Sequence, residues 1–298
     1  MNKWSFWKKD WFVGLLVALV FLSGANSDLM QSLERKAYDL GVLASSRTPS
    51  DKIAVIAIDD QSIANLGRWP WPREIHARMI DILAAGHAKV IGHTAFFFEP
   101  QVDAGLGYIY KIAELLGKSS LLENVDAASS VSAASSVSAA SQIELSQLDA
   151  LLMEAKKNLD NDQKLSESMA KANDVLLAMF FELGEPQGKP DQPLPDYVLR
   201  NNLVNVKDAS ASGAVPLPSR SVLPPIPVLG SKALAVGHLN SFPDVDGAVR
   251  TEPLVVGYYD QHYPSLSLML AAKSLNLEPK DIHVNLGEGV QLGNQKIA

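Results

Sequence analysis

Residues 53–98, IAVIAIDDQSIANLGRWPWPREIHARMIDILAAGHAKVIGHTAFFF, carry the pattern that decides the fold class. The run 53–58 is apolar at both alternating sets of positions, which is typical of a central strand in a covered, parallel sheet. A helix is predicted to begin near Pro72 and to end at Gly86. The apolar run 89–98 predicts a second strand. Strand, helix and strand in this order predict a βαβ unit with a right-handed crossover.

The elements beyond this unit are weaker but follow the same rules. The patterns predict a helix at 102–117, strands at 175–181, 234–239 and 249–258, a helix at 265–275, and a hairpin at 282–292. The proline-rich residues 184–227 have little periodicity and are expected to be irregular chain. We therefore expect an α/β fold: a mixed, largely parallel sheet flanked by helices, with a helical insertion and an N-terminal membrane helix.

The insertion is expected at about residues 118–174. The hexapeptide AASSVS at 127–132 recurs at 133–138, which is typical of a low-complexity spacer. Apolar residues then step by three and four positions, at Leu145, Leu148, Leu152, Ala155 and Leu159. This spacing predicts an amphipathic helix, either in a short coiled coil or packed on its own domain.

The composition excludes several classes of function. The net charge of -7 argues against the basic surface needed to bind nucleic acid. Because the chain contains no cysteine, it has no disulfide framework, thiolate metal site or cysteine nucleophile. The sequence also lacks a Walker loop, a G-x-S-x-G elbow, an HExxH helix and a G-x-G-x-x-G turn after a strand.

The first residues have the pattern of a membrane segment. Three lysines precede the apolar run 11–25, and tryptophans stand where a membrane interface would lie. At ~1.5 Å per residue the run reaches only about 22 Å, short of the ~30 Å hydrocarbon core. We expect Phe6, Trp7 and Leu29 to extend it into a permanent anchor. The alternative is a signal peptide that is cleaved after Ala25.

Two carboxylates follow the first predicted strand, at the sheet edge where open α/β sheets bind ligands. Asp59 and Asp60 are expected to lie at a similar height to His93 in the second strand. Together they suit a hard or borderline cation, with Glu99 and Asp103 as further oxygen donors.

A structural lock is the alternative for the same carboxylates. One aspartate would cap the helical turn that follows, and the other would pair with Arg68 or Arg73. In the adjoining pentapeptide WPWPR, residues 69–73, two prolines bias Trp69 and Trp71 toward extended backbone, so that their rings are expected to point in roughly opposite directions. One ring is expected to cover the sheet edge, and the other to face solvent, a ligand or a partner.

A second polar motif lies between the strands predicted at 234–239 and 249–258. Asp244, Asp246 and Gly247 resemble the opening of a calcium loop, but the twelfth position is Val255 where a glutamate is required. A tight turn in which Arg250 pairs with one aspartate explains the motif better.

Two long stretches together resemble one family. AVIAIDDQSIANLGRWPWPREIHARMIDILAAGHAKVIGHTAFFFEPQVD and VGHLNSFPDVDGAVRTEPLVVGYYDQHYPSLSLMLAA are similar to the two signatures of the type-two CHASE domain, covering residues 53–117 and 222–276. In that family the second strand commonly carries an aspartate where this chain has His93. The serine-alanine repeat and the leucine-rich helix lie outside the signatures.

The resemblance implies an extracytoplasmic sensor of a bacterial receptor, with no enzymatic activity or cofactor in this chain. Residues 1–26 would be a cytoplasmic tail and inner-membrane anchor, and residues 27–298 a periplasmic sensor domain that is truncated at its C-terminus. The sensor would bind an unknown small molecule or envelope ligand, form a homodimer, and relay the stimulus through stalk helices to a cytoplasmic kinase or cyclase domain not present in this chain.

Two rival functions remain open at this point. A periplasmic metal-dependent hydrolase would use Asp59, Asp60 and His93 as ligands. A purely structural envelope interaction module would use the leucine-rich helix of the insertion.

Overall fold

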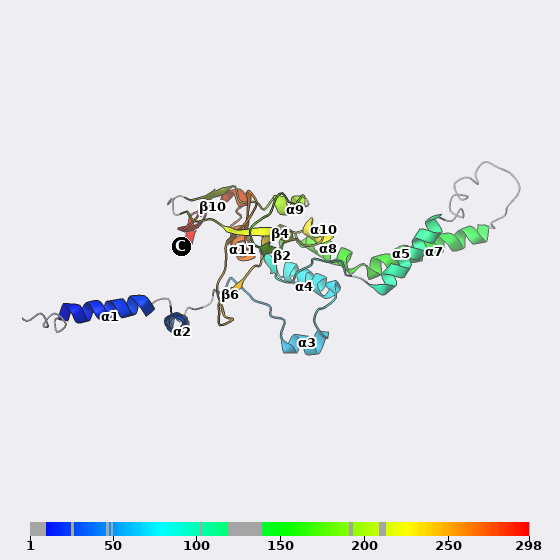
Figure 1. Ribbon diagram of the computed structural model, residues 1–298. Helices are drawn as coiled ribbons and strands as arrows, with labels where there is room; N and C mark the ends of the chain where they lie inside the picture. Colours follow the sequence, from blue (N-terminus) through cyan, green and yellow to red (C-terminus); the bar gives the residue numbers. More distant parts are fainter. Residues whose placement is uncertain are drawn as a thin grey trace, which may run out of the picture. The chain divides into compact units, whose positions relative to one another are not determined.

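The computed structural model describes residues 10–24, 27–45, 48, 50–101, 103–118, 139–190, 193–208 and 213–297. The chain divides into two compact units, Met1–Asn65 and Leu66–Ala298. Each unit is described by itself below, and Figure 1 shows their elements.

The described part of the first unit begins with two helices in sequence. Helix α1 spans Asp10–Gly24, and α2 spans Asp28–Ala44 after Ser27, whose Oγ accepts a hydrogen bond from the Met30 amide at 3.4 Å. Among the described residues, no helix combines the length and the apolar character needed to cross a membrane. Leu29, expected to extend the membrane segment, belongs to α2, whereas Phe6 and Trp7 lie outside the described residues.

The central strand predicted at residues 53–58 is not formed. These residues have no strand assignment and are exposed, from 47% at Ile58 to 87% at Val55. They are followed by helix α3, Asp60–Leu66. Apolar alternation indicates that both faces of a segment favour burial, but it does not specify the strand with which the segment pairs. The prediction of a βαβ unit beginning at residue 53 is therefore wrong for this structure.

The second unit is built on a six-stranded mixed sheet. Its order is β1–β2–β4–β8–β9, with β5 also paired to β2, and its strands are β1 Ile91–His93, β2 Val175–Leu183, β4 Leu217–Leu223, β5 Ala235–His238, β8 Val255–Tyr258 and β9 Gln261–Pro264. The pairs β1–β2, β2–β5 and β4–β8 are parallel, whereas β2–β4 and β8–β9 are antiparallel. The expected mixed α/β sheet is confirmed.

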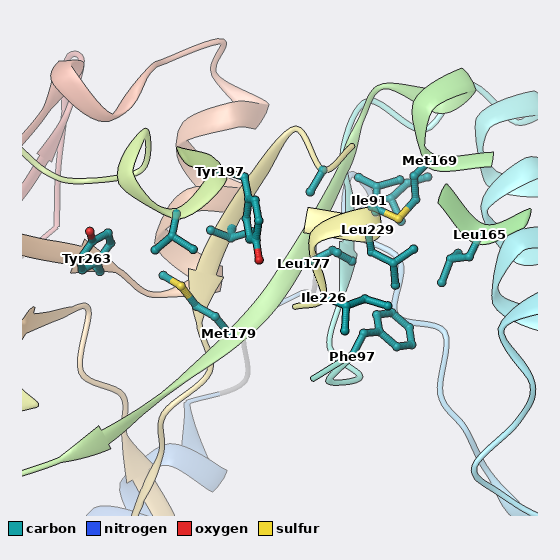
Figure 2. Close-up of a cluster of buried hydrophobic side chains, with 14 of the residues drawn as sticks. Ile91, Phe97, Leu165, Met169, Leu177, Met179, Tyr197, Ile226, Leu229 and Tyr263 are labelled. Atoms are coloured by element: carbon teal, nitrogen blue, oxygen red, sulfur yellow. The ribbon is translucent and has the colours of Figure 1, made fainter. Parts of the chain in front are cut away.

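Helices cover both faces of β2. Val175, Leu177 and Met179 point into a core with α4 (Arg73–Ala85), α8 (Asn161–Ala172), α9 (Asp196–Leu199) and α10 (Pro227–Gly230). Leu176 and Ala178 point to the other face, against α11 (Leu266–Ser274). Figure 2 shows the first core, where Leu165, Met169 and Leu229 meet the strands. The strand predicted at 175–181 is confirmed as β2, and because every side chain from Val175 to Met179 is fully buried, β2 is a central strand.

Smaller elements complete the second unit. A four-stranded sheet has the order β12–β11–β10–β3, with strands Gln295–Ile297, Gly289–Leu292, Ile282–Asn285 and Asn205–Lys207, and a short 3-10 helix covers Pro279–Asp281. The antiparallel pair β10–β11 confirms the predicted hairpin. The predicted strand at 249–258 is divided into β7, Val249–Thr251, which pairs with β6, Phe242–Pro243, and the separate β8. Residues 184–227 contain α9, β3 and β4, so the prediction of irregular chain there is wrong.

Two long helices form an arm of the second unit. Helices α5 (Ala104–Lys118) and α7 (Ala139–Leu159) lie side by side (Figure 1), and we call this pair the arm. The AASSVS repeat joins them and lies outside the described residues. Helix α8 falls within the range expected for the insertion, yet it packs closely on α4, with Leu165 and Met169 fully buried in the core.

Candidate functional site

The WPWPR pentapeptide folds back on itself ahead of α4. The Trp71 indole N–H donates a hydrogen bond to the Gly67 carbonyl at 2.7 Å, and the Trp69–Pro70 peptide bond is cis. The rings of Trp69 and Trp71 meet edge to face, with their centroids 5.4 Å apart, and both side chains are half-buried. The expectation that the two rings point in opposite directions is therefore wrong, since the hydrogen bond to Gly67 turns Trp71 back toward Trp69.

A pair of histidines lies next to the tryptophans. Nε2 of His93 on β1 lies 3.0 Å from Nδ1 of His76 on α4, and the Ala95 amide donates to the other ring nitrogen of His93 at 3.3 Å. The His76 ring also contacts Trp69 and Phe97, with centroid distances of 5.6 and 5.5 Å. We call Trp69, Trp71, His76, His93 and Phe97 the Trp–His cluster.

The Trp–His cluster favours neutral imidazoles. Burial, together with a smaller effect of the neighbouring His76, lowers the pKa of His93 to about 4. Burial also lowers the pKa of His76, and the adjacent Arg73 charge acts in the same direction. Because the Ala95 amide donates to Nδ1 of His93, its proton must lie on Nε2, which then donates to Nδ1 of His76. The pair is thus a neutral, oriented hydrogen-bonded unit between α4 and β1.

Arg73, the first residue of α4, makes the most contacts in the site. Its Nε lies 2.5 Å from Oδ1 of Asp162, its terminal nitrogen donates to the Glu99 carbonyl, and its guanidinium carbon lies 4.9 Å from the centroid of Phe97. The Arg73 backbone amide donates to Oε1 of Gln101 at 2.8 Å, and the Gln101 amide donates to Oδ2 of Asp162 at 2.9 Å. We call Arg73, Gln101 and Asp162 the Arg73 clamp.

The Arg73 clamp lies where the arm joins the sheet. Gln101 precedes α5, whereas Asp162 lies in the first turn of α8, directly after α7 ends at Leu159. The Arg73 and Asp162 side chains are only 14% and 11% exposed, so the pair is shielded from solvent. A buried ion pair leaves a costly uncompensated charge when one partner is removed. The two ends of the arm are therefore held to α4 by one residue, Arg73.

The other predicted residues do not form a metal site in the part of the chain that the structure describes. Asp59 caps α3, because its Oδ1 accepts the Ser62 amide at 2.8 Å and the Ser62 hydroxyl at 2.6 Å. Both hydrogen bonds lower the pKa of Asp59, and the bond from the Ser62 hydroxyl contributes more than the bond from the Ser62 amide. Asp60 and Arg68 are exposed, and Glu99 contributes its backbone carbonyl to Arg73. No group of three His, Asp or Glu residues able to hold a metal is found there.

The alternative of a structural lock is therefore observed in part and with other partners. One aspartate does cap the turn at Ser62, as expected. The arginine of the pentapeptide pairs with Asp162 instead of Asp59 or Asp60. Asp103, proposed as an oxygen donor, caps α5 by accepting the Leu106 amide at 3.1 Å.

The second motif is the tight turn that the sequence favours. Arg250 pairs with Asp244 at 2.9 Å and with Asp246 at 2.8 Å, and the Gly247 amide donates to the Asp244 carbonyl at 2.8 Å. Gly247 has φ +83°, a left-handed conformation that glycine adopts without strain. The Arg250 side chain is 13% exposed, so the motif holds the β6–β7 turn.

Four residues of the site were missed by the sequence analysis: His76, Phe97, Gln101 and Asp162. His76 follows Arg73 by one helical turn, so the predicted helix already placed both on one face. Phe97 alternates with His93 and Ala95 along the apolar run 89–98. Asp162 carries no such signal, because it lies within the range expected for the insertion and no local pattern connects it to Arg73.

Comparison with known proteins gave one match. A family model described as CHASE2 domain matches residues 12–297. No curated protein matches the chain, and neither does any solved structure.

Proposed function

Because this chain belongs to the CHASE2 domain family, whose members are extracellular sensory domains, we propose that it is the sensing part of a transmembrane receptor. The family is non-catalytic and extracytoplasmic, which agrees with a chain that senses a stimulus outside the cytoplasm. A kinase or cyclase domain outside this chain would produce the response. The stimulus would be a small molecule or an envelope component.

The Arg73 clamp is the observation that carries this proposal. It joins three parts that a sensor must couple: helix α4, which lies within the first family signature, the sheet, and the arm. The shielded guanidinium of Arg73 contacts Glu99 and Asp162, and the Arg73 backbone amide contacts Gln101, so one residue reaches both connections to the arm. A ligand that changed the position of the arm would therefore have to repack or break these contacts. We propose that the clamp has a second arrangement, because a ligand acts by shifting the population between two states.

Helix α2 is proposed as the stalk that carries the signal to the membrane. Leu29, Leu33, Leu40 and Leu43 are spaced by four, seven and three residues, and they are 53–80% exposed. This spacing is that of a coiled-coil seam. An isolated helix of this length is marginal in water unless its apolar stripe is covered. We propose that α2 pairs with α2 of a second copy, so that the receptor is a homodimer.

Residues 1–26 are proposed as the anchor of the receptor in the inner membrane. The apolar sequence of α1, with lysines ahead of it, supports this proposal. Alkaline phosphatase fused after residue 298 is expected to be active in a bacterial host, because the enzyme needs the oxidising periplasm, and to sediment with membranes. Removal of residues 1–26 should abolish both results. An inactive fusion whose protein level is normal would contradict the extracytoplasmic location.

The sensing role is tested by ligand-induced stabilisation. The full chain should gain thermal stability with at least one member of a panel of envelope metabolites and cell-wall fragments, because a ligand that binds only the folded state stabilises it. The Arg73→Gln variant should bind with altered affinity if the clamp is coupled to ligand, whereas Arg220→Gln, on an exposed pair with Glu182, should bind as the wild type does. Identical affinities of wild type and Arg73→Gln would contradict a role of the clamp in sensing.

A second candidate function is an envelope interaction module. The observation in its favour is the arm, which exposes Tyr108, Ile112 and Leu115 at i, i+4 and i+7 on α5, and Leu151 on α7. This reading expects the full chain to capture an envelope protein that a variant with Tyr108→Ser and Leu115→Ser does not capture. It expects no stabilisation by small molecules, which separates it from the receptor proposal.

A further inference from the structure

Two hydrogen bonds orient the histidine pair of the Trp–His cluster. The Ala95 amide donates to Nδ1 of His93 at 3.3 Å, and Nε2 of His93 donates to Nδ1 of His76 at 3.0 Å. A neutral imidazole has one acceptor nitrogen, and here each ring already uses it. Neither ring therefore has a free lone pair to which a proton could add.

A proton taken up by the pair must displace one of these hydrogen bonds. On Nδ1 of His76 the new N–H would face the N–H of His93, and on Nδ1 of His93 it would face the amide of Ala95. Each case sets two donors against each other and leaves at least one of them unsatisfied. The geometry of the closed pair thus accepts only neutral imidazoles.

The nearest charge adds to this preference. Arg73 lies one helical turn before His76. Its guanidinium lies over Phe97, whose ring contacts the His76 and His93 rings at centroid distances of 5.5 and 4.9 Å. The counter-charge of Arg73 is Asp162 of α8, whose Oδ1 lies 2.5 Å from Nε of the guanidinium. An imidazolium would thus stand beside a cation whose carboxylate is already engaged.

The other charged side chains around the pair do not compensate an added proton. On the elements packed against the pair they are Arg68 and Glu99 on the adjoining chain, Glu74, Arg78 and Asp81 on α4, and Lys164, Glu167 and Lys171 on α8. All are exposed except Lys164, which is half-buried and pairs with Glu74 at 3.6 Å. Among the described residues, no carboxylate is hydrogen-bonded to either imidazole. A protonated pair would therefore have no bonded counter-charge.

The histidine pair also joins the Arg73 clamp to the sheet. His76 and Arg73 lie on α4, whereas His93 lies on β1. Arg73 holds both connections to the arm, through Gln101 on one side and Asp162 on the other. If the pair opens, α4 loses a polar contact with β1 at the end where the arm is held.

We propose that acid is a stimulus of this sensor, and that a proton taken up by the pair of His76 and His93 opens the contact between α4 and β1 and changes the position of the arm. The proposal rests on the sensing function proposed above and names one stimulus for it. The proton acts here as a ligand that binds the open state better than the closed state.

The titration of the pair agrees with this proposal. Burial and then His76 lower the pKa of His93 in the closed pair to about 4, and burial and then Arg73 lower the pKa of His76. In an opened pair the imidazoles titrate near the ordinary value of 6.5. The open state therefore binds more protons between pH 6.5 and 4, and for one proton its share relative to the closed state rises by up to about tenfold per pH unit. For His93 alone the increase over this range is on the order of a hundredfold.

Distances between spin labels test the switch, because the natural chain contains no cysteine that would have to be removed. One label is attached at Leu115→Cys on α5 and the other at Val204→Cys just before β3, two positions that are 70% and 66% exposed. The full chain in mild detergent is measured by double electron–electron resonance between about pH 7 and pH 4.5, below the ordinary pKa of histidine. We expect a second distance whose share relative to the first grows by up to about tenfold per pH unit. A label pair within the arm, Leu115→Cys with Leu151→Cys, should keep one distance.

Two variants separate the pair from other effects of acid. In the double variant His76→Gln with His93→Asn, neither position can take up a proton, so the second distance should not grow. His93→Glu places a carboxylate beside His76, with which a protonated His76 would pair, so the acid response should again be lost. Each variant tests the proposal by itself if the other does not fold. His283→Gln removes an exposed histidine of β10 and is the matched control, which should respond as the wild type does.

Three outcomes would overturn the acid switch. The first is a single distance in the wild type at every pH at which circular dichroism shows a folded chain. The second is a response of the double variant or of His93→Glu that equals that of the wild type. The third is a second distance that appears only together with loss of the circular dichroism signal, since this is global unfolding. None of them bears on the sensing proposal, because the ligand panel is tested at neutral pH, where the pair is closed.

Discussion

Arg73 shows how one side chain can serve several elements at once. Its guanidinium pairs with Asp162, donates a hydrogen bond to the Glu99 carbonyl and lies over the Phe97 ring. The side chains of Arg73 and Asp162 are both largely shielded from solvent. This geometry makes Arg73 a structural residue of the WPWPR motif. The charged end of the motif is directed into the protein, and any ligand contact would involve the half-buried tryptophans instead.

Loss of the arginine should be costly. Arg73→Gln is expected to lower the free energy of unfolding by about 3 kcal/mol, because Asp162 would stay shielded without its counter-charge. The control Arg220→Gln breaks an ion pair with Glu182 in which both side chains are at least half exposed, and it should cost under about 1 kcal/mol. Urea denaturation of both variants measures the difference. Equal costs would show that the Arg73 pair is solvated in solution.

Gly237 on β5 marks the closest approach between the sheet and α11. A Cβ at this position would lie 2.6 Å from the Cα of Leu266, and backbone cannot move aside as a side chain can. Gly237→Ala is therefore expected to destabilise the protein by about 2 kcal/mol or more. Gly107→Ala on α5 is the control, since nothing lies within 4 Å of its Cβ, and it should stabilise the helix by about 0.5–1 kcal/mol. Thermal unfolding of the two variants should give shifts of opposite sign.

At the residue scale, some residues of the site were predictable from the sequence. Trp69, Trp71, Arg73 and His93 do lie in one neighbourhood, because they belong to a helix start and a strand that are close along the chain. The partner of Arg73 was not predictable. Asp162 follows the arm helices, so its position depends on how the arm returns to the sheet, and no periodicity encodes that return.

At the scale of elements, α11 depends on its cap. The Ser265 hydroxyl accepts the Leu268 amide at 3.2 Å, and Ser265 is fully buried. Ser265→Ala is expected to cost about 1–2 kcal/mol, because a helix N-terminus loses its cap and the amide has no water to replace it. Ser274→Ala, at the other end of the same helix, should cost less. Comparison of their denaturation midpoints checks this, and equal midpoints would contradict a capping role.

Elements were predicted best where the signal that defines them is local in the sequence. The strand at 175–181 and the hairpin at 282–292 are confirmed, because burial on both faces and a glycine turn are local signals. The segment 53–58 carries the same signal of double-sided burial, yet it is exposed. The sequence pattern alone does not distinguish these two segments. Hydrophobic alternation shows that a segment favours burial, whereas its contacts with other elements determine where it is buried.

At the scale of the molecule, stability should depend on acid. Burial lowers the pKa of His93 and of the fully buried His238 to about 4, from 6.5 in the unfolded chain. Between these values the unfolded chain binds more protons than the folded protein, so the stability present above pH 6.5 is lost as the pH falls toward 4. For His93 alone the loss is on the order of 1–3 kcal/mol.

Urea titrations at several pH values measure this slope. The His93→Asn variant should show a shallower fall in the free energy of unfolding between pH 6.5 and 4, because one buried titrating group is absent. The remaining fall is assigned to His76 and His238. A wild-type free energy of unfolding that is constant across this range would show that the imidazoles are accessible to water.

By contacts, the whole chain divides between Asn65 and Leu66. The boundary near residue 26, where the apolar composition ends, separates an expected membrane anchor from the sensor and stays a prediction. The amino-acid composition of a segment indicates whether it favours water or an apolar environment, but the division of a chain into compact units depends on packing contacts. Among the described residues of the first unit, α2 has no buried residue and the apolar side chains of residues 53–58 are exposed.

The arm also bears on how this protein can evolve. Its two helices lie side by side, and the AASSVS repeat stands between them in the sequence. Tandem repeats in a gene gain and lose copies through slippage during replication. Because doubling the length of a closed loop costs only about 0.6 kcal/mol, such changes would be nearly neutral for folding. Repeat number should therefore vary between strains, while the lengths of the segments around Arg73 stay fixed.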